Sequence, residues 1–142
     1  MAQRESDKKG GPRDLPVAAV NAEQGKALGE AFWTICNKYG LTRAQQAALL
    51  GLRATSRIKS LETEQEIPLE PDKFARVGLL LGIHKNLRIM FPENKEVVYA
   101  WMRTAREMFS GKSAIDWIME DEIHTYDRLF TVRRRLDEMR NR

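Results

Sequence analysis

The sequence contains a single cysteine, Cys36, among its 142 residues. An intramolecular disulfide is therefore impossible, and so is a zinc site built on cysteine pairs, so we expect Cys36 to pack as a small apolar side chain. The two histidines, His84 and His124, lie far apart, and neither belongs to a spacing that is typical of metal ligands. The sequence thus predicts no metal site and no bound cofactor.

Long apolar runs are also missing. The run at residues 17–20 is too short for an export signal. The run at residues 77–83 is closed by His84 and Lys85, far below the roughly 20 residues that span a bilayer. We therefore expect a cytoplasmic protein that makes no contact with a membrane.

Signals for β-structure and for catalysis are sparse. No Asn-Gly or Asp-Gly turn occurs, and no segment alternates between apolar and polar residues over the length of a strand. Gly111, Lys112 and Ser113 resemble the end of a phosphate-binding loop, but Arg106 stands where that loop requires its first glycine. No nucleophile has a paired base. The sequence predicts an all-helical protein that is not an enzyme and has no catalytic residue.

What the chain does have is an uneven distribution of charge. Its 24 basic and 20 acidic residues leave a net charge of only +4. Residues 41–61, however, include Arg43, Arg53, Arg57 and Lys59 and no acidic residue, and acidic residues follow directly. A local basic surface of this kind is typical of contact with a polyanion.

The same segment has the pattern of a helix-turn-helix. Thr42 can cap a first helix, with Gln45 reaching back from the third position, and Gly51 can end that helix in a tight turn. Ile58 and Leu61 are three residues apart, so both can face the core from a second helix. We predict that the turn and the outer face of this helical pair bind DNA through Arg43, Arg53, Thr55, Ser56, Arg57 and Lys59.

Within this set, the first two arginines and Lys59 are expected to contact phosphates, whereas residues 55–57 are expected to read bases. Two recognition helices are needed to reach successive major grooves, so we expect a homodimer. Two other interpretations of the basic hairpin remain. It is either an ordinary solvated helical pair, or the surface of a structural adaptor that binds an acidic protein.

Apolar residues recur at three- and four-residue spacing through most of the remaining chain, which predicts further helices. One is expected at residues 22–39 with Gly40 as its stop, and a long one from Pro71 to about Phe91. Short helices are expected on either side of a turn at Gly111. A final helix is expected to carry an apolar stripe formed by Ile123, Tyr126, Leu129, Phe130, Leu136 and Met139.

We divide the chain into three regions. Residues 1–20 are polar and rich in glycine and proline, which predicts a flexible N-terminal arm. Residues 21–68 contain the helix-turn-helix. Residues 69–142 contain a linker helix and a small helical C-terminal domain.

Two stretches of the C-terminal region carry a resemblance. Residues 81–94 read L-G-I-H-K-N-L-R-I-M-F-P-E-N, and residues 99–116 read Y-A-W-M-R-T-A-R-E-M-F-S-G-K-S-A-I-D. They resemble the L-G-I-x-x-x-L-x-x-L-F-P connection and the W-[LM]-R-T and F-x-G-[KR]-S signature of the Xre/MbcA/ParS antitoxin family. Ala105 and Arg106 depart from the family, which often has Pro-Asn there, and the second helix of the hairpin lacks an aromatic residue frequent in the family.

The resemblance implies an Xre-like DNA-binding domain followed by a toxin-binding domain, the layout of a type II antitoxin. Such a protein would bind and block a RES-domain toxin that consumes NAD⁺, and would bind operator DNA to repress its own operon. The toxin-binding residues that it implies are Trp101, Arg103, Phe109, Lys112, Arg133, Arg134, Arg135 and Arg140.

Alternatives remain for these residues and for the whole chain. For the two aromatic residues, core packing is the first interpretation and burial at an interface is the second, and a solvated helix end is a second interpretation of the arginine run. A stand-alone helix-turn-helix repressor, with C-terminal helices that serve only for dimerisation, is the alternative function.

Overall fold

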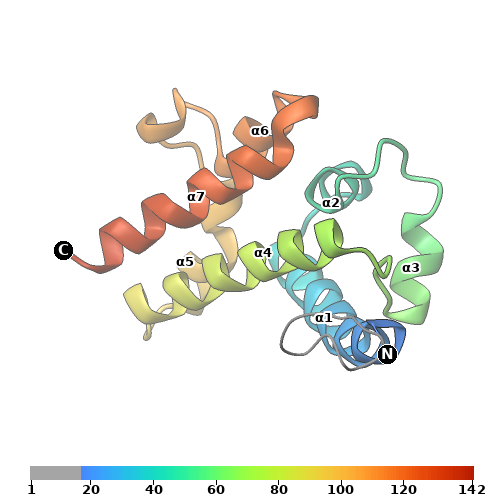
Figure 1. The fold of residues 1–142 in the computed structure, drawn as a ribbon. Helices are drawn as coiled ribbons and strands as arrows, with labels where there is room; N and C mark the ends of the chain where they lie inside the picture. Colours follow the sequence, from blue (N-terminus) through green and yellow to red (C-terminus); the bar gives the residue numbers. More distant parts are fainter. Residues whose placement is uncertain (1–16) are drawn as a thin grey trace, which may run out of the picture.

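The computed structural model describes residues 17–142, and all of its regular elements are helices (Figure 1). In chain order they are α1 (Val17–Tyr39), α2 (Arg43–Leu50), α3 (Ile58–Glu64), α4 (Pro71–Met90), α5 (Lys95–Ala100), η2 (Trp101–Arg103), η3 (Glu107–Phe109), α6 (Ala114–Met119), η4 (Glu122–His124) and α7 (Thr125–Arg140), where η marks a short 3-10 helix. Extended backbone within this range pairs only at an isolated bridge between Ala105 and Ser113. The all-helical prediction is confirmed for the described residues.

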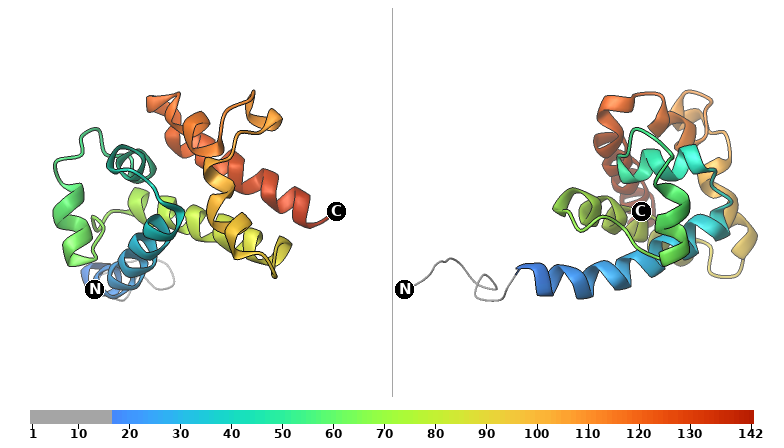
Figure 2. Two further views of the ribbon diagram at one scale, coloured as in Figure 1. Left: turned by 180° about the vertical axis from the view of Figure 1, so that it is seen from behind. Right: turned by 90° about the vertical axis from the view of Figure 1, so that its right-hand side faces the viewer.

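The long helices α4 and α7 lie side by side and run in the same direction (Figures 1 and 2). Polar contacts fix both ends of this pair. Near the start, Arg76 Nη1 donates a hydrogen bond to Thr125 Oγ1 at 2.8 Å, and near the end Asn86 Nδ2 donates to Asp137 Oδ1 at 2.7 Å. Between these contacts the facing side chains are apolar and buried: Val77, Leu80, Ile83 and Leu87 on α4, and Leu129, Val132 and Leu136 on α7.

Helix α1 packs across α4 and buries its aromatic face. Trp33 is 1% exposed, and its indole Nε1 donates a hydrogen bond to the carbonyl oxygen of Glu66 at 2.8 Å. Next to this contact, Gly29 lies against the backbone carbonyl of Gln65, where a side chain on α1 would collide. The segment after α3 is thereby held close to α1.

The buried apolar residues form one continuous core. It includes Phe32, Leu50 and Ile58 from the predicted helix-turn-helix region, together with Leu80 and Trp101 from the predicted C-terminal region. Helix α4 connects the two, because it contacts α1 and α2 as well as α5 and α7. The predicted boundary at residue 68 therefore does not separate two hydrophobic cores.

Several predicted helix ends are confirmed, and the predicted stripe of the last helix is confirmed in part. Pro71 opens α4, and Gly40 follows α1 with a φ of 67°. Ile123, however, lies in the turn η4 and is 83% exposed, and Phe130 is 49% exposed. Since α7 starts only at Thr125, Ile123 lies outside the helix. The predicted members Leu129 and Leu136 are buried, together with Thr125 and Val132, which the prediction did not include.

The sequence predicts a flexible arm at residues 1–20. Residues 1–16 of the predicted arm lie outside the described residues, and α1 begins at Val17, within the last part of that arm. None of the helices from residue 17 onward combines the length and the apolar character that are needed to cross a membrane.

Candidate nucleic-acid interface

The first helix of the basic hairpin has both of the ends that its sequence predicts. The Thr42 side chain accepts a hydrogen bond from the Gln45 amide at 3.1 Å, and the Gln45 side chain accepts one from the Thr42 amide at 2.9 Å. Gly51 ends α2 with a φ of 71°. Side chains rarely tolerate this left-handed conformation, so glycine suits the position.

The second helix, α3, is anchored from one side only. Ile58 is fully buried and Leu61 is 9% exposed, as their spacing predicts. The predicted DNA-binding residues other than Arg43 lie in the turn and on the first turn of α3, and all of them are exposed. Lys59 is on the first turn of α3, while Arg53, Thr55, Ser56 and Arg57 precede the helix. The structure thus places the predicted base readers on the turn rather than on α3.

The cations of this surface differ in their ionic partners. Arg43 Nη1 donates to Glu62 Oε1 at 2.6 Å, so this arginine is already paired. Arg53, Arg57 and Lys59 form no ion pair with any described residue. The positive charge that remains available is therefore concentrated on the turn and at the start of α3.

The charges along α3 run from basic to acidic. Lys59 lies on its first turn, and Glu62 and Glu64 lie near its end. A helix dipole favours the opposite order, with acidic groups near the first turn and basic groups near the last. The order of charges along α3 therefore does not stabilise the helix through its dipole.

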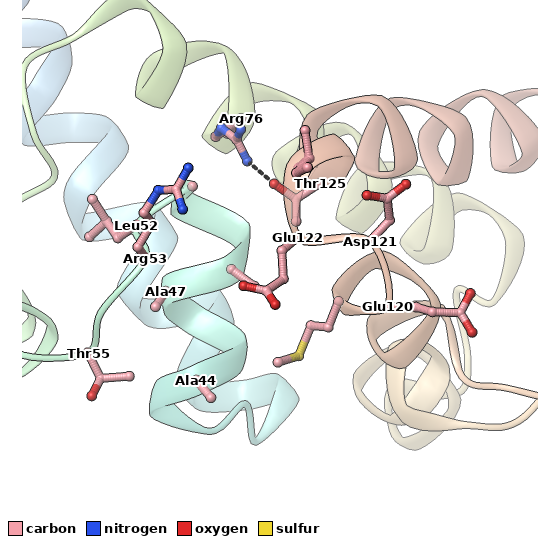
Figure 3. Close-up of a pocket in the computed structure, with 14 residues that line it drawn as sticks. Ala44, Ala47, Leu52, Arg53, Thr55, Arg76, Glu120, Asp121, Glu122 and Thr125 are labelled. Carbon is pink, nitrogen blue, oxygen red and sulfur yellow. Dashed lines mark hydrogen bonds between the residues drawn. The ribbon is translucent and has the colours of Figure 1, made fainter.

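A cleft of about 770 Å³ borders the turn (Figure 3). One wall consists of α2 and the turn up to Thr55, and the other consists of residues 119–125. Arg76 of α4 also lines the cleft and links the two walls, because its Nη1 donates a hydrogen bond to Thr125 Oγ1 at 2.8 Å and another to the Leu49 carbonyl at 3.5 Å. Sequence reasoning missed this cleft, because its walls come from segments far apart in the chain.

The acidic residues of the second wall point in different directions. Glu120 pairs with Arg128 and Lys112, and Asp121 pairs with His124. Hydrogen bonds from these partners lower the pKa values of both carboxyl groups. Glu122 has no ionic partner among the described residues, and Figure 3 shows its carboxylate directed toward α2 while the other two point away.

The predicted toxin-binding aromatic residues are in the core. Trp101 is 1% exposed and Phe109 is fully buried, and their rings meet edge to face with centroids 6.2 Å apart. Neither side chain can be reached from solvent in this fold. The structure thus places both residues in the core, as the first interpretation expects, and from there they support the turn at residues 104–113.

Arginines stack on these two rings and on the half-buried ring of Trp117. The guanidinium carbon lies 4.5 Å from the ring centroid for Arg106 on Trp101, 4.6 Å for Arg128 on Trp117 and 5.7 Å for Arg135 on Phe109. Such cation–π contacts stabilise a turn by about 0.5–2 kcal/mol each. Burial lowers the pKa of Arg106, whose Nε is buried with no hydrogen-bond partner among the described residues.

The remaining predicted toxin-binding residues are divided between internal contacts and solvent. Arg103 Nε donates to the Tyr39 carbonyl at the end of α1, and Arg135 Nη1 donates to the Met108 carbonyl at 2.7 Å. Lys112 pairs with Glu120, and Arg133 crosses Gly82 and pairs with Asp137. Arg134, which is exposed, and Arg140, which is half-buried, form no hydrogen bond or ion pair with any described residue.

Possible metal ligands are scattered over the described residues. Within residues 17–142, histidine, cysteine, aspartate and glutamate side chains nowhere gather in a group of three or more that could hold a metal ion. Burial raises the pKa of the Cys36 thiol well above its usual range, so this cysteine stays protonated in the core.

Fold and site together define a small all-helical protein with an exposed basic turn between two short helices. Over 112 residues the chain is 30% identical to the protein described as "Uncharacterized protein y4oB" from Sinorhizobium fredii (strain NBRC 101917 / NGR234), with 78% of this chain and 82% of that protein covered. The chain belongs to the same family as y4oB. No protein-family model matches the chain, and no solved structure matches it.

Proposed function

We propose that this protein binds DNA through the turn before α3 and the outer face of α3. The observation that carries the proposal is the exposure of Arg53, Arg57 and Lys59 without ionic partners among the described residues, on a hairpin whose apolar side is buried. Clustered cations favour a polyanion, because phosphate contacts release condensed counterions. The hydroxyl groups of Thr55 and Ser56 lie between these cations in the chain and can hydrogen-bond to base edges.

We propose further that the protein is a cytoplasmic type II antitoxin of the Xre/MbcA/ParS kind. It would neutralise a RES-domain toxin that consumes NAD⁺ and would repress its own operon as a homodimer. The support is the likeness of residues 81–94 and 99–116 to that family. The second stretch is braced by the stacked arginines, so it would present Met108, which is 37% exposed, as part of a rigid partner surface.

The stand-alone repressor is the second candidate, and one set of observations favours it. Trp101 and Phe109 are buried, and Arg103, Arg133 and Arg135 make contacts within the chain. Fewer of the predicted toxin-binding side chains are therefore free for a partner. In this alternative the C-terminal helices serve for dimerisation alone.

The DNA-binding proposal is tested with a double Arg57→Ala and Lys59→Ala variant. Both side chains are exposed, so the fold is expected to persist. Affinity for the DNA upstream of the protein's own gene should fall, and the slope of log K against log salt should become shallower by about two, about one for each lost phosphate contact. Gel shifts at several salt concentrations measure both quantities.

The matched control is a double Lys85→Ala and Arg88→Ala variant, which removes two exposed cations from the second half of α4. It should keep the affinity and the salt slope of the unmodified protein. If both double variants change the slope equally, binding follows net charge rather than the turn, and the proposed interface is wrong.

Co-expression tests the antitoxin proposal and separates it from the alternative. The product of the neighbouring gene should arrest growth and deplete NAD⁺ only when this chain is absent. Charge reversal of Arg134 and Arg140 to Glu should weaken the rescue while DNA binding persists. A neighbouring gene product that is harmless on its own would leave the repressor as the better explanation.

A further inference from the structure

The cleft beside the basic turn has opposite charges on its two walls. Arg53 belongs to the wall formed by α2 and the turn, and Glu122 belongs to the wall formed by residues 119–125. These two groups do not pair with each other or with any other described residue, whereas Glu120 and Asp121 on the same wall are paired. Each wall thus keeps one unsatisfied charge, and the two charges have opposite signs.

One wall of the cleft carries an exposed apolar side chain, and the other wall is lined by short side chains. Ile123, at 83% exposure, is the most exposed large apolar side chain among the described residues, and it lines the cleft. The opposite wall is lined by Ala44, Ala47, Ala48 and Gly51, which recur with helical spacing on one face of α2. Their short side chains leave the space that the cleft encloses. Burial of Ile123 in a hollow of this kind would remove its apolar surface from water.

We infer that two copies of this chain associate through the cleft, related by a two-fold axis at its mouth. An isologous interface brings each surface against the same surface of the partner. Ile123 of each copy would then enter the alanine hollow of the other, and Arg53 of each copy would face Glu122 of the other. Self-complementarity favours this occupant, because a partner of one charge would be attracted to one wall and repelled by the other.

The dimer surface and the proposed DNA interface share Arg53 and Thr55, which both line the cleft. Ser56, Arg57 and Lys59 do not line the cleft, so association leaves them outside it. The inference depends on no part of the DNA-binding proposal. Its test contains no DNA, so one proposal can fail while the other stands.

The test uses the full chain and two single charge reversals, Arg53→Glu and Glu122→Arg. Each reversal sets like charges against each other at both symmetric contacts, so each should raise the dissociation constant of the dimer by about tenfold or more. An equimolar mixture of the two variants should associate again, because every contact in the mixed dimer joins an acid to a base. Sedimentation velocity measures the association, and native mass spectrometry identifies the mixed species.

Apolar variants supply the matched control. Ile123→Ser should weaken the dimer, whereas Phe130→Ser, which alters a half-exposed apolar residue outside the cleft, should leave it unchanged. Circular dichroism establishes that each variant is folded. The inference is overturned if the unmodified protein is monomeric at every concentration, if the two charge variants fail to associate when mixed, or if both apolar variants weaken the dimer equally.

Discussion

Two glycines in the long helices differ in what surrounds them. A Cβ at Gly29 in α1 would collide with the backbone carbonyl oxygen of Gln65, whereas a Cβ at Gly78 in α4 would meet no described atom within 4 Å. Glycine inside a helix destabilises the folded state because it loses more conformational entropy than alanine does. A glycine is required there only where a neighbouring atom comes too close for a Cβ. Such an approach exists at Gly29 and not at Gly78.

Substitution by alanine should therefore have opposite effects at the two positions. Gly29→Ala should lower the free energy of unfolding by about 1–3 kcal/mol, because backbone atoms must move to make room. Gly78→Ala should raise it by up to about 1 kcal/mol through helix propensity. Urea denaturation of both variants measures the difference, and equal effects would show that the contact between Gly29 and Gln65 is not required.

His84 forms a polar pair with Tyr39 at the edge of the core. The Tyr39 hydroxyl oxygen and His84 Nδ1 are 2.9 Å apart and share a hydrogen bond. Burial lowers the pKa of His84 below its ordinary value of 6.5, and the nearby charges of Arg88 and Lys38 lower it further. The neutral imidazole is thus the form that the fold favours.

This pKa shift predicts a pH dependence of stability. The unfolded chain takes up the proton near pH 6.5, before the folded protein does, so the free energy of unfolding should fall as the pH drops below about 6.5. The loss is complete below the lowered folded pKa. Urea denaturation at several pH values between about 7.5 and 5, on both sides of the ordinary histidine pKa of about 6.5, measures the slope of the free energy of unfolding against pH. A His84→Gln variant should show a flatter slope, and an unchanged slope would assign the effect to other groups.

At the scale of elements, the short helix α2 depends on its ends. It has 8 residues, and isolated helices below about 12 residues are marginal in water. The capping box at Thr42 satisfies its first amides, and the left-handed Gly51 amide hydrogen-bonds to carbonyls of its last turn. The helix that forms one wall of the cleft is therefore defined by residues at its termini as much as by its buried face.

Removal of the cap should have a measurable cost. Thr42→Ala should lower the free energy of unfolding by about 1 kcal/mol, because the Gln45 amide loses its acceptor. Thr42→Ser keeps the hydroxyl and should stay close to the unmodified protein. Thermal denaturation followed by circular dichroism compares the three proteins, and an alanine variant as stable as the serine variant would mean that packing alone holds α2.

At the scale of the whole molecule, one core joins the two predicted regions. Trp33 lies in the first region, and Trp101 and Trp117 lie in the second. Because α4 covers α1 and α2 as well as α7, neither region can bury its apolar face alone. The chain should therefore unfold as a single cooperative unit.

Labelling with 5-fluorotryptophan tests this cooperativity. The fluorine signals of Trp33, Trp101 and Trp117 should lose their folded intensity at the same urea concentration. A fragment of residues 1–68 should show no stable fold by circular dichroism, because α1 and α2 would lack their cover. Separate transitions, or a folded fragment, would restore the division into two domains.

Local patterns determined most of the helical elements. The ends of α2, the start of α4 at Pro71 and the anchoring of α3 by Ile58 and Leu61 follow from residues within a few positions of one another. Caps, turns and helical spacing act over about one or two helical turns, so the sequence alone suffices to predict them. The exposed cations of the turn follow for the same reason.

Only the tertiary structure decided which side chains are available to a partner. It buried Trp101 and Phe109, left Ile123 in solvent and set Arg53 across a cleft from Glu122. Each of these outcomes depends on contacts between segments far apart in the chain, which spacing within one helix does not specify. The sequence therefore determined where the helices and the basic turn lie, and the packing of α4 against α1, α2 and α7 determined the surfaces that they present.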